Sequence, residues 1–352
     1  MNKKNYFWYN FRGILILLIV FGQFLYTYSL ELNGSVADVI YTCINTFCIP
    51  AFVFSFGYLS KSERARGKTE LTVLLLYYIL FNTVMLLLLY FFKDKAIRLL
   101  YPSSFCWFVL SLIFWKKVVE PLSKIKGIIP ISAVAALLVG FCGDFSNLLA
   151  IRRTVAYFIF FLLGYKFDPE SFKKMIRSRS AKKYLIALAV TCVGVAALIL
   201  IVKNFNITHT MMQMGAYKQP LHLVYRLFIM GVSVCAIVSL LMLTPTANIS
   251  VLTTLGRNSL LIFLSQAFVV ELFERLFRFN NYSEKYILYA AFATLITCIL
   301  FGDNRLNKFA DGIARRTALH IVNGDTVGKR LQTAILIGLL VLMAAVPILK
   351  AL

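Results

Sequence analysis

The first apolar stretch of the chain carries two polar residues, and polar side chains within a membrane span are the first candidates for function. Arg12 lies near its start, and Gln23 lies 11 residues further on. Eleven residues at about 100° each make nearly three helical turns, so both side chains occupy one face, about 16 Å apart. A guanidinium binds phosphate, and an amide hydrogen-bonds a hydroxyl. Both are candidate catalytic residues, although a snorkelling interfacial charge and a helix–helix hydrogen bond are alternative explanations.

Three further polar residues belong to a late apolar stretch. Asn258 or Ser259 is a plausible helix start after a turn at Gly256, and Gln266 follows Ser259 by seven residues. Residues seven apart share a helix face, so Ser259 and Gln266 should point the same way. We expect Asn258, Ser259 and Gln266 to bind substrate.

A double arginine and a tryptophan complete the candidate substrate-binding set. Arg152 and Arg153 precede an apolar stretch on the side of the membrane that should be extracytoplasmic, against the usual bias of basic residues. One of the two is therefore expected to have a function. Trp107 opens another apolar stretch, where an interfacial aromatic belt is the simpler explanation.

The elements that must position these residues are membrane-spanning helices. Hydrophobic residues make up 60% of the sequence and charged residues 15%, against roughly 45–50% and 25% in soluble domains. About 20 apolar residues span a bilayer as a helix. The sequence predicts an all-α polytopic transmembrane helix bundle. The eleven predicted spans are 11–30, 37–60, 71–92, 104–118, 127–143, 153–168, 184–202, 223–243, 258–277, 286–302 and 331–350.

The second span contains a proline and a glycine with separate expected roles. Pro50 lacks an N–H and leaves the carbonyl of Thr46 without its helical partner, so a kink is expected there. Gly57 permits a close approach of backbones near the cytoplasmic end.

Most of the 37 basic residues fall in alternate connections. This bias predicts a cytoplasmic N-terminus in a multi-pass protein of the plasma membrane. The net charge of +22 is then explained by charges that face lipid head groups, and no nucleic-acid partner is expected. The basic patch over 166–183 could also attract a phosphorylated donor.

No segment is long and apolar enough to form a separate soluble domain. We expect a ten-helix membrane domain over 1–302, a cytoplasmic linker over 303–330 and one additional transmembrane helix over 331–352. The seven cysteines form no CxxC pair and no cluster with zinc spacing, so they are expected to be packing residues and no metal site is predicted.

Five segments, taken in order, resemble the type-3 acyltransferase family of bacterial membrane enzymes. That family has an arginine followed by Val-X-Gly-His, then His-Met-Pro with Ser-Gly-Tyr, then Trp-Phe-Leu-X-X-Leu, then an arginine with Phe-Phe-X-X-Gly-Tyr, and finally Gly-X-Asn-Ser-Leu-X-Ile-Tyr-X-X-His. The matching segments here are Arg12 with Val20–Gln23, Cys48–Pro50 with Phe56–Tyr58, Trp107–Leu112, Arg153 (or Arg152) with Phe160–Tyr165, and Gly256–Gln266.

The departures from the family pattern that affect its chemistry fall on histidines. Gln23, Cys48 and Gln266 occupy the three histidine positions. Glutamine cannot accept a proton near neutral pH, and a general base contributes about 10²–10⁴-fold to a rate. None of the chain's own histidines, His209, His222 and His320, replaces them in sequence.

The resemblance implies O-acylation of a cell-envelope polysaccharide or a lipid-linked sugar, with acyl-CoA as a co-substrate and no tightly bound cofactor. Arg12 would hold the donor, Gln23 the acceptor, and Arg152 or Arg153 either of them. Two alternatives stay open: a non-catalytic relative that binds or exports a lipid-linked saccharide, and an unrelated small-molecule transporter. A transporter would require acidic residues within the membrane, and Glu120, Glu271 and Glu274 are expected near the interfaces.

Overall fold

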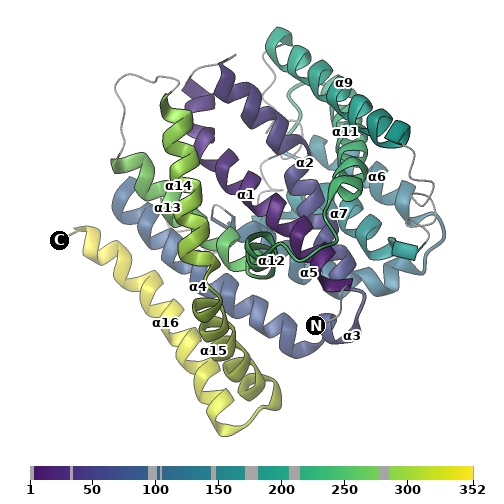
Figure 1. Cartoon of the computed structure of the whole chain (residues 1–352). Coiled ribbons are helices and arrows are strands. Elements are labelled where there is room, and N and C mark those ends of the chain that lie inside the picture. Colours follow the sequence, from purple (N-terminus) through teal and green to yellow (C-terminus); the bar gives the residue numbers. More distant parts are fainter. Residues whose placement is uncertain are drawn as a thin grey trace.

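The computed structural model describes residues 4–31, 35–93, 101–103, 105–143, 148–170, 181–205, 215–276 and 285–351. Within these ranges the regular structure is entirely helical, which confirms the all-α part of the prediction (Figure 1). The helices are α1 (Lys4–Glu31), α2 (Val36–Leu59), α3 (Glu63–Arg66), α4 (Lys68–Lys93), α5 (Cys106–Ser123), α6 (Ile128–Leu138) with the 3-10 turn η1 (Val139–Phe141), α7 (Ile151–Lys166), α9 (Ala181–Phe205), α11 (His222–Leu243), α12 (Ser250–Arg257), α13 (Ser259–Leu276), α14 (Lys285–Gly302), α15 (Asn304–Asn323) and α16 (Thr326–Ala351).

In the part of the chain that the structure describes, six helices are long and apolar enough to cross a membrane: α1, α2, α4, α7, α11 and α14. The pair α12 and α13, bent by 79°, forms a seventh candidate, and the apolar helix over Ile128–Phe141 is shorter. The chain is therefore a multi-pass membrane protein. The count of ten helices plus one stays a prediction.

The bend between α12 and α13 lies at Asn258, which forms hydrogen bonds with the residues at the end of α14. The side-chain Nδ2 of Asn258 donates to the carbonyl oxygen of Gly302 at 2.7 Å and to Oδ1 of Asn304 at 3.0 Å. The predicted helix start at Ser259 is confirmed. Gly256 lies inside α12 rather than in a turn.

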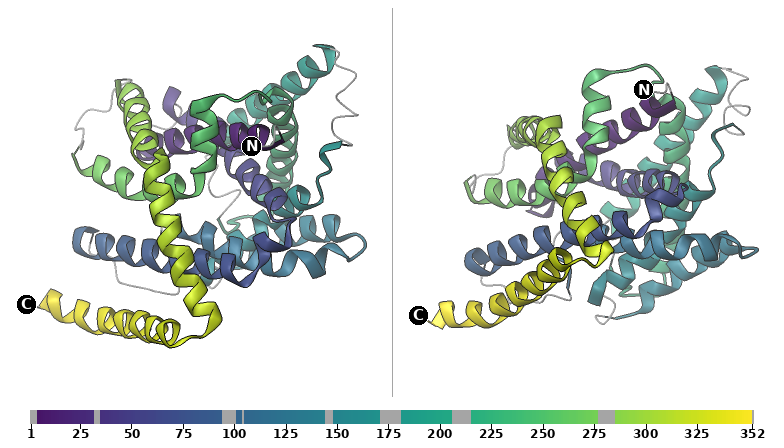
Figure 2. Two further views of the ribbon diagram at one scale, coloured as in Figure 1. Left: turned by 60° about the horizontal axis from the view of Figure 1, so that its bottom comes forward. Right: turned by 90° about the horizontal axis from the view of Figure 1, so that it is seen from below.

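The segment 303–330, for which the sequence predicts a linker, contains the helix α15. Asp303 caps its start and Gly324, with a φ of 67°, ends it. Ala314 and Ala318 pack on Val73 of α4, and Arg315 pairs with Glu70 of α4. Hydropathy averaged over a window misses such a helix because its apolar and polar residues alternate with the helical period. Beyond it, α16 projects from the body of the molecule (Figures 1 and 2).

Two pairs of helices touch through glycine. A Cβ on Gly57 of α2 would overlap the carbonyl oxygen of Phe161 on α7, and one on Gly164 would overlap that of Phe54. The close approach predicted at Gly57 is thus confirmed. Lys61, just past α2, donates to the carbonyl of Phe167, just past α7. The two helices therefore end together and run parallel.

Helices α1 and α12 meet in the same way. A Cβ on Gly13 would overlap the carbonyl oxygen of Leu252, and one on Gly256 would overlap that of Tyr9. This contact places the beginning of α13 beside the turn of α1 that contains Arg12.

Pro50 lies inside a continuous α2, and the carbonyl it frees has another partner. The hydroxyl of Ser233 on α11 donates to the carbonyl oxygen of Thr46 at 2.6 Å. A neighbouring helix thus satisfies the polar group that the proline leaves open. The predicted kink stays a prediction.

Candidate functional site

Arg12 is a buried cation without a carboxylate partner in the part of the chain that the structure describes. Its side chain is 7% exposed, and its Nε has no hydrogen-bond partner. The Cζ atom lies 5.5 Å from the ring centroids of both Tyr9 and Phe56. Two ring faces stabilise a guanidinium only in part, because its N–H donors lie in its plane and need acceptors. A buried charge of this kind calls for an anionic ligand.

Two polar side chains of α13 are also buried and unsatisfied. Ser259 and Gln266 are both 0% exposed, and neither the Ser259 Oγ nor the two amide atoms of Gln266 has a hydrogen-bond partner among the described residues. An unsatisfied buried polar group lowers the stability of the folded protein by about 1–3 kcal/mol. Three such atoms on one helix therefore indicate that a molecule binds here.

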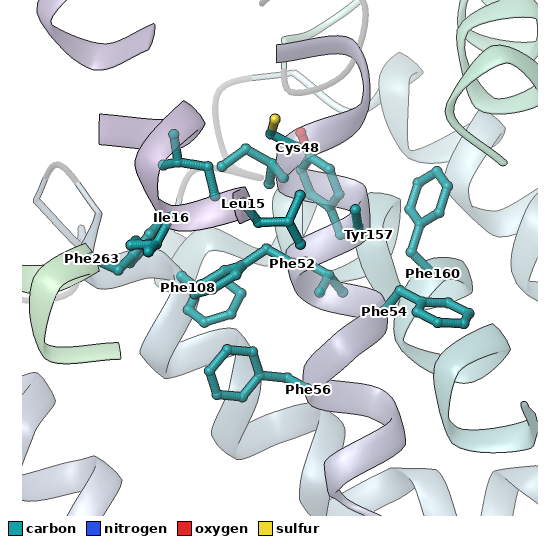
Figure 3. Close-up of a cluster of buried hydrophobic side chains, with 14 of the residues drawn as sticks. Leu15, Ile16, Cys48, Phe52, Phe54, Phe56, Phe108, Tyr157, Phe160 and Phe263 are labelled. Carbon is teal, nitrogen blue, oxygen red and sulfur yellow. The ribbon is translucent and has the colours of Figure 1, made fainter. Parts of the chain in front are cut away.

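A stack of phenylalanines joins Arg12 to this face of α13. Phe56, which Arg12 covers, lies 5.0 Å from Phe52, and Phe52 stacks on Phe263 at 5.3 Å (Figure 3). Phe263 follows Ser259 by four residues and precedes Gln266 by three, the spacing of one helix face. We refer to Arg12, Phe56, Ser259, Phe263 and Gln266 as the Arg12 cluster.

Gln23 belongs to the other half of α1. It is half-buried, and its neighbour Gly22 faces Ile44 and Asn45 of α2. Its distance from Arg12 along the helix is about 16 Å, whereas Tyr26 lies only three residues away. Gln23 is thus close to a second group of residues.

This second group combines an arginine with aromatic side chains from four helices. The Arg153 Cζ lies 5.4 Å from the ring centroid of Trp107, and Trp107 stacks on Tyr157 at 5.5 Å. Tyr26 and Tyr41 form a pair at 5.6 Å, and Tyr26 and Tyr157 lie near Arg153. We refer to Tyr26, Tyr41, Trp107, Arg153 and Tyr157 as the Arg153 cluster.

Arg152 binds backbone carbonyls rather than the Trp107 ring. It is 5% exposed, and its Nη2 donates to the carbonyl oxygens of Gly143 at 2.7 Å and Cys142 at 3.3 Å. Of the two arginines that the sequence predicted as alternatives, Arg153 is therefore the one in contact with Trp107.

Asn258, bound to Gly302 and Asn304, has a structural role.

The structure adds Arg226, which the sequence did not single out, and places Glu271 in a buried position. Arg226 is 2% exposed and donates to the carbonyl oxygens of Ala136 and Gly215. Glu271, expected near an interface, is 5% exposed and is the one buried carboxylate among the described residues. It lies two residues from Phe273, whose ring centroid is 5.0 Å from that of Phe24, the neighbour of Gln23. The sequence could have identified both residues, because each is a charged residue within a predicted span.

The cysteines differ in burial, and Cys43 and Cys235 are half-buried. Cys48, Cys106 and Cys298 are buried, as expected of packing residues, whereas Cys142 and Cys192 are exposed. Cys48, at a position where the resemblance implies histidine, is fully buried in the core that Figure 3 shows.

The predicted site residues thus fall into two clusters at different heights of the bundle. Arg12 belongs to one, where ring contacts through Phe56 and Phe52 link it to Phe263, on the face of α13 that carries Ser259 and Gln266. Arg153 and Trp107 belong to the other, and Gln23 lies near the second. Tyr26 follows Arg12 by 14 residues, about 21 Å of helix rise. One cluster suits an anionic group, and the other offers hydroxyls and a cation.

No protein-family model matches the chain, and neither does any curated protein or solved structure.

Proposed function

We propose that this protein is an integral-membrane O-acyltransferase. It transfers an acyl group, acetyl being the simplest, from an acyl-CoA-type donor to a hydroxyl of a cell-envelope polysaccharide or a lipid-linked sugar. The observation that carries the proposal is Arg12, a buried guanidinium whose Nε is unpartnered within the described chain. The five sequence segments that resemble type-3 acyltransferases support it, because Arg12, Trp107, Ser259 and Gln266 all lie in them.

The orientation proposed places the N-terminus in the cytoplasm and the protein in a bacterial plasma membrane. Basic residues gather at the end of the bundle where α1 begins, which supports this. Some have structural roles there: Arg66 donates to the carbonyl oxygen of Ser60 at 2.6 Å and pairs with Glu120, and Lys116 donates to that of Ala65. In this orientation the Arg12 cluster lies toward the cytoplasm, where acyl-CoA is available.

The two clusters suggest separate binding sites for the donor and the acceptor. Arg12 binds the negatively charged part of the donor, while Ser259 and Gln266 hydrogen-bond its polar arm. The extended arm then runs along α1 toward Gln23. The acceptor enters from the opposite side and meets the acyl group near Gln23 and the Arg153 cluster.

In the reaction, the acceptor oxygen attacks the thioester carbonyl carbon. A C–O bond forms, the C–S bond breaks, and the thiol leaves. The proton of the acceptor hydroxyl must pass to a base or to the departing sulfur. Gln23 cannot take it. Glu271 is the one buried carboxylate among the described residues and lies two residues from Phe273, which contacts Phe24 beside Gln23. We propose it as the proton acceptor.

The test is acyl transfer by the purified protein in liposomes. Labelled acetyl-CoA is supplied on one side and delipidated envelope glycan on the other. The proposal expects label on the glycan that alkaline treatment releases, since an ester is alkali-labile. Donor hydrolysis without glycan labelling, or no reaction with any envelope fraction, would contradict it.

A second candidate is a relative that binds or exports a lipid-linked saccharide without chemistry. The amides at positions 23 and 266 favour it, because a binding site needs hydrogen bonds but no base. Saccharide binding without any transfer would support this candidate.

Buried Glu271 is also what a proton-coupled transporter would need, and substrate uptake driven by a pH gradient would point to that class.

A further inference from the structure

Helix α15 has a second apolar face, which no part of the described chain covers. Its packed face, around Ala314, contacts α4. Away from α4, the side chains of Leu306, Phe309 and Ile313 are exposed, that of Phe309 by 69%. At about 100° per residue these three lie within about 60° of one another, so they form one apolar stripe about two helical turns long. We refer to Leu306, Phe309 and Ile313 as the Phe309 stripe.

A row of basic side chains borders this stripe on one side. Arg316, Arg305 and Lys308 follow Phe309 around the helix at about 20°, 40° and 100°, and all three are exposed. The ion pairs of the described chain include none of them, whereas Arg315, nearer α4, is paired with carboxylates. An exposed apolar stripe with cations along its edge is typical of a helix that lies on an anionic lipid surface.

The position of α15 places the Phe309 stripe at the boundary of the membrane. Both α4 and α14 are long and apolar enough to span it, and α15 begins directly after α14 ends at Gly302. Near the beginning of α4, α15 lies across that helix (Figure 2): Arg315 pairs with Glu70, and Asp311 lies near Tyr77. The stripe is therefore continuous with surfaces that face lipid, at the level where α4 enters the membrane. A lipid surface fits it better than a soluble protein does.

We infer that α15 lies in the membrane interface and binds anionic phospholipids. The Phe309 stripe inserts among the acyl chains, and Arg305, Lys308 and Arg316 bind the phosphate groups of the lipids. The segment between α14 and α16 is then a membrane-bound element rather than a linker in water. This inference does not depend on the proposed function, since it needs neither an acyl donor nor an acceptor.

The experiment uses a bimane label at position 309 of the full-length protein, in nanodiscs and in a background without native cysteines. Phe309→Cys is chosen because this side chain is exposed. The quenchers are phosphatidylglycerol and phosphatidylcholine with brominated acyl chains, supplied in turn at equal mole fraction, and acrylamide in the water. We expect both lipids to quench the label more than acrylamide does. At low ionic strength phosphatidylglycerol should associate at least about fivefold more strongly, the contribution of one basic residue near an anionic surface.

Removal of the basic row should abolish the lipid preference and keep the insertion. In the combined variant Arg305→Gln, Lys308→Gln and Arg316→Gln, the two brominated lipids should quench the label equally, because the Phe309 stripe remains. A high salt concentration should weaken the preference of the unmodified row, because it screens exposed charges. A label at position 308 instead of 309 should be quenched more by acrylamide, since it points about 100° away from the stripe.

The matched control removes three exposed cations elsewhere. Arg64 belongs to α3, and Lys124 and Lys126 lie between α5 and α6. The combined variant Arg64→Gln, Lys124→Gln and Lys126→Gln changes the net charge by the same amount as removal of the basic row does. It should leave the lipid preference at position 309 unchanged.

Quenching at position 309 by acrylamide but not by the brominated lipids would overturn the inference, because the stripe would then lie in water. Protection from all three quenchers would overturn it as well, since a second copy of the chain or another protein would then cover the stripe. Equal quenching of the unmodified row by the two lipids would rule out anionic lipid as the ligand. Loss of the preference in the control variant would do the same, because the effect would then not belong to α15.

Discussion

Gly57 and Gly164 face each other's helix in a reciprocal contact. Each glycine lies against the carbonyl of the residue three positions before the other, Phe161 for Gly57 and Phe54 for Gly164. Helices α2 and α7 therefore pack backbone on backbone. This contact fixes the distance between Phe56, under Arg12, and the helix that carries Arg153.

Gly164→Ala should lower thermal stability because the added methyl has to push the α2 backbone away. Overpacking of this kind costs about 1–3 kcal/mol. Gly231→Ala on α11 is the matched control, since a Cβ there meets nothing within 4 Å; alanine should be neutral or stabilising in a helix. Thermal unfolding of both variants in detergent checks this. Equal effects would show that the α2–α7 contact is not tight.

Gln23→Ala and Glu271→Gln should separate a hydrogen bond from a base. Loss of one oriented hydrogen bond costs about 1 kcal/mol, a five- to tenfold decrease in kcat. Loss of a general base costs about 10²–10⁴-fold. Glu63→Gln, at an exposed carboxylate, serves as the control. If Gln23→Ala abolishes transfer while Glu271→Gln does not affect it, the assignment of the proton acceptor is wrong.

The positions of the apolar helices followed from hydropathy, because a lipid-facing helix needs a long apolar run, whereas α3, α12 and α15 lie outside the predicted spans. The shared, buried face of Ser259 and Gln266 followed from helical geometry. The roles of Arg152 and Arg153 could not be assigned in this way. Neighbouring residues point about 100° apart, so which of them meets Trp107 depends on the rotation of α7, and packing against α5 sets that rotation. The burial of Glu271 and Arg226 likewise depends on neighbouring helices.

Helix α15 was missed for a different reason. Leu306, Phe309 and Ile313 repeat at helical spacing, but the polar residues between them lower the average hydropathy below that of a span. Periodicity, rather than hydropathy, was the signal.

The orientation predicts which cysteines a membrane-impermeant reagent labels. Lys308→Cys on α15 and Lys218→Cys before α11 are both exposed sites, each to be placed in a background without native cysteines. In intact cells the reagent should label position 218 and not position 308, and position 308 should react after permeabilisation. Labelling of position 308 alone in intact cells would reverse the orientation.

The turn between α15 and α16 should weaken in acid. Hydrogen bonds from His320 (2.8 Å) and from the Gly328 N–H (2.6 Å) lower the pKa of Asp325 below its ordinary 3.8. A lowered carboxyl pKa stabilises the folded state above the ordinary value, and that stabilisation is lost as the pH falls through the lowered one. Hydrogen-exchange protection over residues 320–328 should therefore be constant from neutral pH to about pH 4 and decrease below it.

Asp325→Asn should reduce that protection at neutral pH already, because the neutral amide cannot form the same charge-assisted bonds. Protection that is the same in Asp325→Asn and the unmodified protein at neutral pH would contradict this account of the turn.

The proposed function requires that Arg12 binds the anionic part of the acyl donor. The most direct measurement is the KM for acetyl-CoA in the liposome transfer assay, for the unmodified protein, Arg12→Gln and Arg12→Lys, with exposed Arg64→Gln as control. We predict that Arg12→Gln raises the donor KM about 10- to 100-fold, the cost of a lost charge-assisted pair, that Arg12→Lys raises it less, and that Arg64→Gln leaves it unchanged. An unchanged donor KM in a stable Arg12→Gln protein would contradict the claim.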